Sequence, residues 1–124
     1  MAKSLLIVDD SATMRKIILR TIRMSGLEFD RTEEAGNGSE ALGKLGSGPV
    51  DIMLCDVNMP EMNGMELVKK VREMDSCVNM KIIMVSTESS QELINNLIAE
   101  GANGYITKPF TPEKFQEKLS PLMN

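Results

Sequence analysis

The chain has 124 residues, enough for one domain with a single hydrophobic core, and its formal net charge is −4. Hydrophobic residues make up 42% of the sequence and charged residues 26%, with no block of Lys or Arg, which argues against direct nucleic-acid binding because phosphate contacts need a basic surface. No apolar run approaches the ~20 residues of a membrane span, and the apolar stretch after Lys3 is too short for a signal peptide, so we expect a cytoplasmic protein without membrane insertion.

Two residue types narrow the chemistry further. The sequence contains no histidine, which excludes His-ligated zinc, a Ser-His-Asp triad and an imidazole base. Any phosphohistidine in this protein's chemistry must therefore belong to another protein. Of the two cysteines, Cys55 lies inside an apolar run, where we expect a buried, inert thiol, and we expect no disulfide with Cys77.

Short apolar runs alternate with amphipathic segments along the chain. Five runs are predicted strands: Leu5–Asp9, Asp30–Ala35, Asp51–Asp56, Lys81–Ser86 and Gly104–Thr107. The second is polar, as an edge strand often is. The first, third and fourth are rich in Leu, Ile, Val and Met, as expected for strands buried on both faces.

Helices are predicted between the strands, because apolar residues recur there at the spacing i, i+3, i+4, i+7. Glu follows a capping residue by three positions in NGSE (37–40), NGME (63–66) and SSQE (89–92). Thr111 precedes Pro112, a favourable first-turn residue, and Gly26, Gly46 and Gly101 fall where helices should end. The alternation predicts an α/β fold in one domain, with a parallel sheet covered by helices on both faces.

Polar side chains stand at the carboxyl ends of four predicted strands, where open α/β sheets form their binding sites. They are Asp9 and Asp10, Asp56, Ser86 and Thr87, and Lys108. For any one of them, a solvated loop residue or a helix cap is the simpler interpretation, and Asp10 or Ser11 could cap the first helix. Their convergence on one edge is harder to explain in this way.

Three neighbouring carboxylates cannot all remain ionised without a cation. Mg²⁺ binds one or two carboxylates together with phosphate oxygens, so these acids predict a magnesium site. An acid left uncommitted could act as a nucleophile and form an aspartyl phosphate. Lys108 could then neutralise a phosphoryl oxygen, and phosphoryl transfer needs little more than such positioning and charge neutralisation.

Four segments carry a resemblance to a known family: LIVDDS with TMRK, DIMLCDVNMPEMNGMEL, IIMVST and GANGYITKPF. Over residues 1–124 the chain resembles the receiver domain of two-component response regulators, most closely the stand-alone chemotaxis regulators of the CheY type. The resemblance implies a doubly wound (βα)5 flavodoxin-like sandwich with strand order 2-1-3-4-5.

The resemblance also implies roles in the chemistry. Asp56 is the expected phospho-acceptor, assisted by Lys108 and by Ser86. Asp9 and Asp10, together with Asp56 and the backbone carbonyl of Asn58, are the expected ligands of Mg²⁺. The bond between Lys108 and Pro109 is expected to be cis, a geometry largely confined to proline.

Further roles concern switching and output. Ser86 is the expected switch hydroxyl, with Thr87 as the second choice, and Tyr105 is the expected aromatic switch. Its ring could simply be half-buried with the hydroxyl in water, or could turn inward when Asp56 is phosphorylated. Dephosphorylation would be tuned by Asn58 and Glu88. The expected partner surface consists of Ser89, Gln91, Ile94, Tyr105 and Lys118.

Three other classes of protein remain as alternatives. A small haloacid-dehalogenase-type phosphatase also forms an aspartyl phosphate, but its second Asp would stand where this chain has Asn58. A flavodoxin-like module for a nucleotide or flavin would need a glycine- or hydroxyl-rich loop after the first strand, where this chain has DDSATM. A purely structural scaffold would leave the clustered acids unexplained.

We therefore expect a monomeric response regulator that is not an enzyme beyond its own phosphorylation and dephosphorylation. No effector domain is expected after Asn124, so the protein would act through a partner. A CheA-type histidine kinase is the expected phosphoryl donor, and a FliM-type flagellar switch protein is the expected target. A phosphorelay intermediate that passes the phosphate to a histidine phosphotransfer protein is the alternative.

Overall fold

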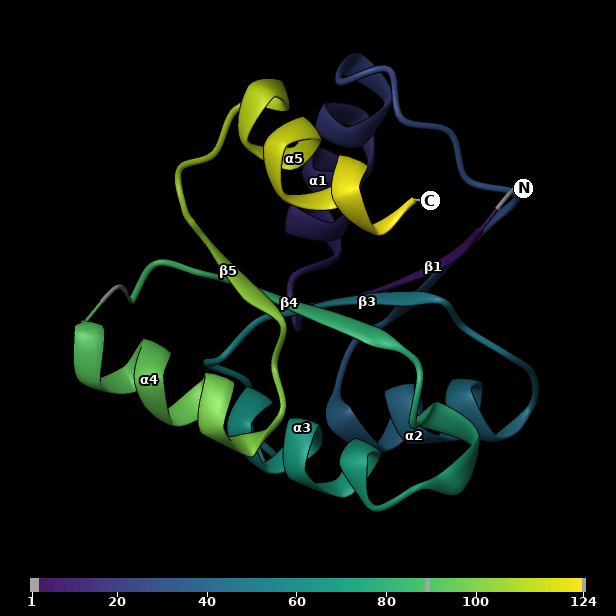
Figure 1. Ribbon diagram of the computed structural model, residues 1–124, viewed down its shortest axis with the longest axis vertical. Helices are drawn as coiled ribbons and strands as arrows, with labels where there is room; N and C mark the ends of the chain where they lie inside the picture. The colour runs from purple at the N-terminus through teal and green to yellow at the C-terminus, as the bar shows by residue number, and fades with distance from the viewer. Residues whose placement is uncertain (1–2, 89, 124) are drawn as a thin grey trace.

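A five-stranded parallel sheet forms the centre of the computed structural model, which describes residues 3–88 and 90–123 (Figure 1). Its strands are β1 (Ser4–Val8), β2 (Arg31–Ala35), β3 (Ile52–Cys55), β4 (Lys81–Ser86) and β5 (Gly104–Thr107). They lie in the order β2-β1-β3-β4-β5. The predicted fold class and strand order are therefore confirmed, and the polar strand β2 does lie at an edge.

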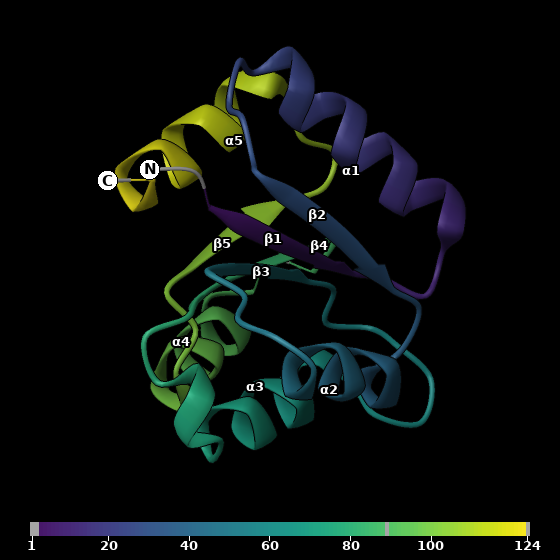
Figure 2. The same cartoon turned by 90° about the vertical axis from the view of Figure 1, so that its right-hand side faces the viewer.

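Helices cover both faces of the sheet. They are α1 (Ala12–Met24), α2 (Gly38–Gly46), α3 (Gly64–Arg72), α4 (Gln91–Glu100) and α5 (Pro112–Leu119), with short 3₁₀ turns at Asp75–Cys77 and Ser120–Leu122. α1 and α5 lie on one face, and α2, α3 and α4 lie on the other (Figures 1 and 2). Within the described part of the chain, no helix has the length and apolar character needed to span a bilayer.

The helices begin largely where the sequence predicts. Asn63 and Glu66 form a complete capping box at α3, and the Asn37 side chain accepts a hydrogen bond from the N–H of Glu40 at α2. The cap of α4 was misplaced by one residue, because Ser90 and not Ser89 is the N-cap. Its side chain accepts from Leu93 N–H, three positions on, whereas Ser89 lies outside the described residues.

The sheet separates two apolar layers. Along β1, Leu5 and Ile7 pack toward α1 and α5, whereas Leu6 and Val8 pack toward the other three helices. Each of these four side chains is at most 1% exposed. Alternating burial on both sides explains why β1 is apolar at consecutive positions. The polar chemistry is therefore confined to the strand ends.

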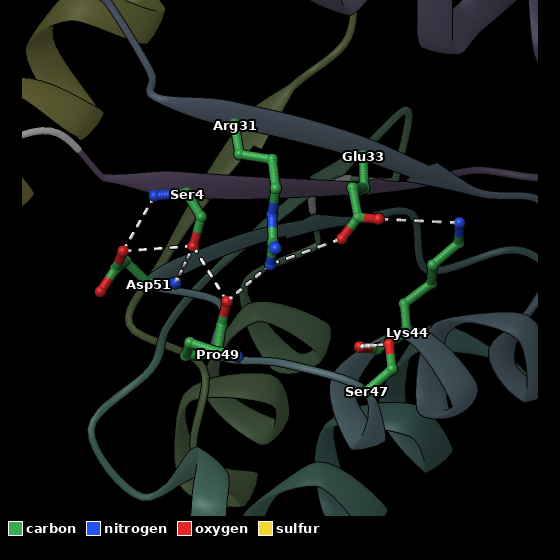
Figure 3. Close-up of polar contacts among 7 residues, drawn as sticks. All are labelled: Ser4, Arg31, Glu33, Lys44, Ser47, Pro49 and Asp51. Atoms are coloured by element: carbon green, nitrogen blue, oxygen red, sulfur yellow. Dashed lines mark hydrogen bonds and ion pairs between the residues drawn. The ribbon is translucent and has the colours of Figure 1, made fainter.

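The amino ends of β1, β2 and β3 are joined by polar contacts (Figure 3). Asp51 Oδ2 accepts hydrogen bonds from the backbone N–H and the hydroxyl of Ser4, at 2.8 and 3.2 Å. Arg31 reaches the carbonyl of Pro49 at 3.0 Å. These contacts help to fix the register of the three strands, which then also sets the alignment of their opposite ends.

Arg72 fixes the carboxyl end of α4. Its guanidinium donates to the carbonyls of Gly101 and Cys77 and to the side chain of Asn103. Gly101 caps α4 with φ 123°, a conformation that side-chain-bearing residues rarely adopt. The carboxyl end of α4 is thus pinned to α3, while its amino end follows β4.

Gly64 allows α3 to begin directly beneath the end of β3. Its N–H donates to the carbonyl of Val57 at 2.8 Å. A Cβ atom built on Gly64 would collide with the carbonyl oxygen of Asp56 and would stand 2.8 Å from the Cα of Val57. Both obstacles are backbone atoms, so the helix start is packed against the residues that follow β3 without room for a side chain.

We expect Gly64→Ala to destabilise the protein by about 1–3 kcal/mol, because backbone atoms must move to make room for the added methyl group. The matched control is Gly43→Ala at an exposed position of helix α2, where a Cβ atom meets nothing within 4 Å. That change should stabilise the protein by about 0.5–1 kcal/mol, because Ala is the better helix former. Urea unfolding followed by circular dichroism measures both. Equal unfolding midpoints for Gly64→Ala and the wild type would contradict the close approach.

Candidate functional site

The register of the sheet brings Asp9 and Asp56 side by side. Val8 of β1 is paired with Cys55 of β3, and each Asp is the next residue. Asp56 N–H donates to the Val8 carbonyl at 2.9 Å, and Asp9 N–H donates to the Ala35 carbonyl at 3.1 Å. Both backbones are therefore held by the last rungs of the sheet, and both side chains are fixed at its carboxyl edge.

Three carboxylates meet at this edge. Asp9, Asp10 and Asp56 each offer one oxygen, and these oxygens lie within 4.8 Å of one another. Asp9 and Asp56 are only 2% and 7% exposed, whereas Asp10 is exposed. Hard carboxylate oxygens at this spacing, with one side open to water, suit Mg²⁺, which keeps several of its waters when it binds protein. The donor set therefore fits the cation that the acids predict.

Lys108 is the cation that the structure places against these acids. Its Nζ lies 3.0 Å from Asp9 Oδ2 and 3.7 Å from Asp56 Oδ2, and the side chain is 12% exposed. The Lys108 N–H donates to the carbonyl of Ser86 at 2.9 Å, which extends the β4–β5 ladder to the edge. The peptide bond between Lys108 and Pro109 is cis, as predicted.

The two buried acids are held to different degrees. Asp9 uses both oxygens, because Oδ1 accepts from Ser11 N–H at 2.9 Å and Oδ2 accepts from Lys108 at 3.0 Å. Asp56 is held more loosely, since Asn58 N–H lies 3.4 Å from Oδ1 and Lys108 lies 3.7 Å from Oδ2. Of the two carboxylates, that of Asp56 therefore has the weaker hydrogen bonds and is the freer to react.

The pKa of Asp56 is raised above its ordinary value, chiefly because burial penalises the charged form. The positive charge of Lys108 opposes this effect, and the negative charge of Asp9 adds to it. Asp56 is thus an acid whose ionisation is costly until more positive charge is present. A bound divalent cation would supply that charge.

Two hydroxyl groups lie buried beside Asp56. Ser86 is 1% exposed, and among the described residues neither its Oγ nor the hydroxyl oxygen of Tyr105 has a hydrogen-bond partner. The Ser86 hydroxyl lowers the pKa of both Asp56 and Tyr105. Burial, the largest influence, raises the pKa of Tyr105. The Tyr105 ring is half-buried and its hydroxyl oxygen is buried, so the simpler of the two interpretations, a hydroxyl that lies in water, does not hold.

The remaining predicted residues differ in their exposure. Thr87, Asn58 and Glu88 are exposed, whereas Ser86 is buried, so of the two neighbouring hydroxyls only that of Ser86 faces inward. The negative charge of Glu88 helps to raise the pKa of Tyr105. On the expected partner surface, Gln91 and Lys118 are exposed and Ile94 and Tyr105 are half-buried, while Ser89 lies outside the described residues.

Cys55 is buried, as expected, and burial raises the pKa of its thiol. The thiol is therefore protonated and inert at neutral pH. Its Sγ lies 3.3 Å from the carbonyl of Asp56, next to the acids but pointing into the core. Cys77 is also buried and free.

Sequence reasoning missed two residues at the edge of the site. Arg15 donates a hydrogen bond to the Asp9 carbonyl and forms an ion pair with Glu34. Arg15 belongs to the quoted TMRK segment, and Glu34 belongs to the predicted polar strand. The pairing of opposite charges on adjacent elements could have suggested the contact, but spacing along the chain does not show which acid a basic residue on a helix reaches.

Comparisons with known proteins agree with this geometry. The model of the response regulator receiver domain family matches residues 5–120. A chemotaxis protein CheY homolog of Campylobacter jejuni is 46% identical over 120 residues, which cover 96% of this chain and 91% of that protein. Chemotaxis protein CheY1 of Helicobacter pylori is 43% identical over 120 residues, which cover 96% of this chain and 95% of that protein.

Solved structures give the same picture. Chemotaxis protein CheY4 of Vibrio cholerae has a TM-score of 0.87 at 37% identity, with 98% of this chain and 99% of that chain covered. The CheX-CheY-BeF3-Mg complex of Borrelia burgdorferi contains a chain with a TM-score of 0.84 at 28% identity, with 98% of this chain and 90% of that chain covered.

Receiver domains are signalling proteins and not conventional enzymes, and they use Mg²⁺, which the acidic cluster fits. The family therefore accounts for the clustered acids, which the scaffold alternative left unexplained. The chain belongs to the receiver domain family of response regulators, and its relatives over nearly the whole length include CheY chemotaxis proteins at 39–46% identity.

Proposed function

We propose that this protein is a stand-alone response regulator that accepts a phosphoryl group on Asp56 from a histidine kinase and then changes its binding to a partner. The observation that carries the proposal is the environment of Asp56. Its carboxylate is buried, loosely held and 3.7 Å from the Lys108 ammonium, within a cluster of three acids. The whole of residues 1–124 would form one receiver domain.

The chemistry follows from these contacts. A carboxylate oxygen of Asp56 attacks the phosphorus of a phosphohistidine, the phosphorus–nitrogen bond breaks, and the electron pair returns to the donor imidazole. The product is an aspartyl phosphate, and Lys108 neutralises one phosphoryl oxygen. Bound Mg²⁺, held by Asp9, Asp10, Asp56 and the Asn58 carbonyl, would neutralise further charge on the phosphoryl oxygens. The donor supplies the imidazole, since this chain contains no histidine.

The buried hydroxyls of Ser86 and Tyr105, which have no hydrogen-bond partner among the residues that the structure describes, support a route from phosphorylation to output. Ser86 would donate a hydrogen bond to a phosphoryl oxygen on Asp56, and Tyr105 would occupy the space beside it. Changing the active population from ~1% to ~99% requires about 5.5 kcal/mol, more than one hydrogen bond provides. Lys108 must therefore contribute as well, through an ion pair that moves from Asp9 toward the phosphate.

The proposed partner surface lies on α4, β5 and α5, which are adjacent in the fold (Figure 1). Its described residues are Gln91, Ile94, Tyr105 and Lys118, and Ser89, the fifth residue of the proposed surface, lies outside the described residues. Asn58 follows Asp56 by two residues and Glu88 follows Ser86 by two residues, and both are exposed. They would tune the approach of the water that removes the phosphate. The protein would catalyse only its own phosphorylation and dephosphorylation.

Chemotaxis is the proposed pathway, because the relatives at 39–46% identity are chemotaxis proteins. The phosphoryl donor would be a CheA-type kinase and the target a FliM-type flagellar switch protein, bound by a monomer in the cytoplasm. The neighbour solved with CheX, BeF3 and Mg supports a partner and a metal for this kind of domain. A phosphorelay role is the alternative, and a transfer assay with kinases and phosphotransfer proteins of the source organism would separate the two.

We expect acetyl phosphate with Mg²⁺ to phosphorylate the wild type on Asp56, because a small donor needs only the nucleophile and its cations. Borohydride trapping followed by mass spectrometry locates the label. Asp56→Asn should carry none, whereas Lys108→Ala should keep part of it. A label on Asp9 or Asp10 in the wild type would show that the assignment of the nucleophile is wrong.

Removal of the Asp56 charge should stabilise the metal-free protein at pH 7. Its folded-state pKa is raised above the ordinary 3.8, so the stability that Asp56 contributes is complete below pH ~3.8 and is lost as pH rises through the folded-state pKa. Asp56→Asn avoids that loss, and Lys108 keeps its contact with Asp9. In EDTA, the urea midpoint of Asp56→Asn should exceed that of the wild type at pH 7, and the difference should shrink toward pH 4. A difference that is independent of pH would contradict this account.

Ser86→Ala should leave phosphorylation of Asp56 largely intact and weaken phosphate-dependent partner binding, because the buried hydroxyl is the one that faces Asp56. Thr87→Ala is the matched control, since its side chain is exposed on the next residue. We expect a loss of about fivefold to tenfold for Ser86→Ala, equivalent to one hydrogen bond, and none for Thr87→Ala. Titration of a FliM-type peptide with beryllofluoride present measures both. The opposite ranking would move the switch role to Thr87.

A further inference from the structure

Arg15 joins the end of β1 to the edge strand β2. It lies in the first turns of α1, where its backbone N–H donates to the Ser11 carbonyl. Its Nη1 donates to the backbone carbonyl of Asp9 at 2.6 Å, and its Nε donates to Glu34 Oε1 at 2.9 Å. The side chain is only 17% exposed. The guanidinium thus binds two groups at once. One is the peptide between Asp9 and Asp10, and the other is the carboxylate of Glu34 on the neighbouring strand.

The position of this guanidinium is fixed from several directions. Glu34 lies next to Ile7 in the β1–β2 register, one row before Val8 and Ala35. A Cβ atom built on Gly36 would stand 3.4 Å from Arg15 Nη1, so the guanidinium also lies against the turn that follows β2. Planar guanidinium groups with two engaged nitrogens hold their partners in a defined orientation.

The peptide that Arg15 contacts determines where Asp10 lies. Asp9 is anchored by its own side chain, through Ser11 N–H and Lys108. Asp10 is exposed, and its carboxylate reaches the cluster from the turn between β1 and α1. The carbonyl of Asp9 forms the peptide bond to Asp10. A hydrogen bond to that carbonyl therefore orients the backbone from which the Asp10 side chain projects.

We propose that Arg15, held by Glu34, is a positioning residue that sets the Asp9–Asp10 turn for Mg²⁺ binding. The inference rests on the proposed function, in which these acids hold the ion. Residues that orient metal ligands without touching the metal typically change metal affinity about 10–100-fold when replaced. Arg15 would act in this way through a backbone carbonyl.

Charge alone predicts the opposite effect. A fixed positive charge beside the acids repels a second cation, so removal of Arg15 should strengthen Mg²⁺ binding if only its charge matters. Removal should weaken binding if Arg15 orients the turn. The sign of the change in Mg²⁺ affinity therefore separates the two effects without any measurement of phosphorylation.

The first experiment is calorimetric titration of Mg²⁺ into unphosphorylated Arg15→Ala. We expect the dissociation constant to rise about tenfold. Lys16→Ala is the matched control, because it removes the same charge from the adjacent residue. The Lys16 side chain is 74% exposed, and its Nζ lies 3.9 Å from Glu34 Oε2. The Mg²⁺ affinity of Lys16→Ala should equal that of the wild type or exceed it slightly. Arg15→Lys should not restore affinity, since one ammonium cannot replace the two-sided contact.

The second experiment tests the other end of the bridge. Glu34→Gln removes the carboxylate that holds Arg15 but leaves Arg15 in place, and it should also weaken Mg²⁺ binding. Glu33→Gln is its control, because Glu33 pairs with Arg31 at 3.6 Å and Lys44 at 3.8 Å, on the side of β2 shown in Figure 3. Both variants lose one negative charge, so a larger loss for Glu34→Gln reflects the contacts of Glu34 with Arg15 and Lys16. Unchanged Mg²⁺ affinity in Lys16→Ala then leaves the contact with Arg15 as the cause.

Mg²⁺ affinity in Arg15→Ala that equals or exceeds that of the wild type would overturn the inference. If Arg15→Ala does not fold, as judged by circular dichroism in EDTA, the comparison of Glu34→Gln with Glu33→Gln decides the question, and equal affinities overturn the inference. At saturating Mg²⁺, labelling of Asp56 by acetyl phosphate should return to the wild-type rate in Arg15→Ala. Failure of the wild type to bind Mg²⁺ or to be labelled would instead overturn the proposed function.

Discussion

The rest of the site depends on an imbalance of charge at the carboxyl edge of the sheet. Asp9, Asp10 and Asp56 bring three carboxylates within 4.8 Å of one another, and the Lys108 ammonium contacts the carboxylates of Asp9 and Asp56. Burial makes this imbalance expensive, as the raised pKa of Asp56 shows. One divalent cation would neutralise the cluster. On the proposed function, the site would accept a phosphoryl group only with that cation bound.

The apolar core lies on both faces of the sheet and does not include the polar residues at its carboxyl edge. Both faces of the central strands are covered by helices, so polar residues are confined to the strand ends, and the register of β1 and β3 places the buried acids together. Gly64 lets α3 begin directly beneath Asp56. On the output side, Arg72 pins the carboxyl end of α4, whereas the amino end of α4 follows Ser86 within a few residues. A movement of Ser86 would therefore displace the amino end of α4 before its carboxyl end.

Much of this arrangement could be predicted because it depends on periodicity and on strand ends. All five strands were placed to within one residue, since apolar runs that stop at charged residues mark their limits. Strand order came only from the family resemblance, because alternation alone does not say which strands are neighbours. The sequence did not predict that Ser90 caps α4 or that the hydroxyl of Tyr105 is buried. Both depend on local geometry, and so does the bridge from Arg15 to Glu34, which joins residues nineteen positions apart.

The central claim is that Asp56 receives the phosphoryl group while Mg²⁺ balances the charge around it. A crystal structure with Mg²⁺ and beryllofluoride, a mimic of the phosphoryl group, tests this most directly. The account predicts beryllium bonded to an oxygen of Asp56, with Lys108 and Ser86 contacting its fluorides. It also predicts Mg²⁺ at about 2.0–2.1 Å from protein oxygens of the cluster. Beryllofluoride on another carboxylate, or Mg²⁺ bound away from Asp9, Asp10 and Asp56, would contradict it.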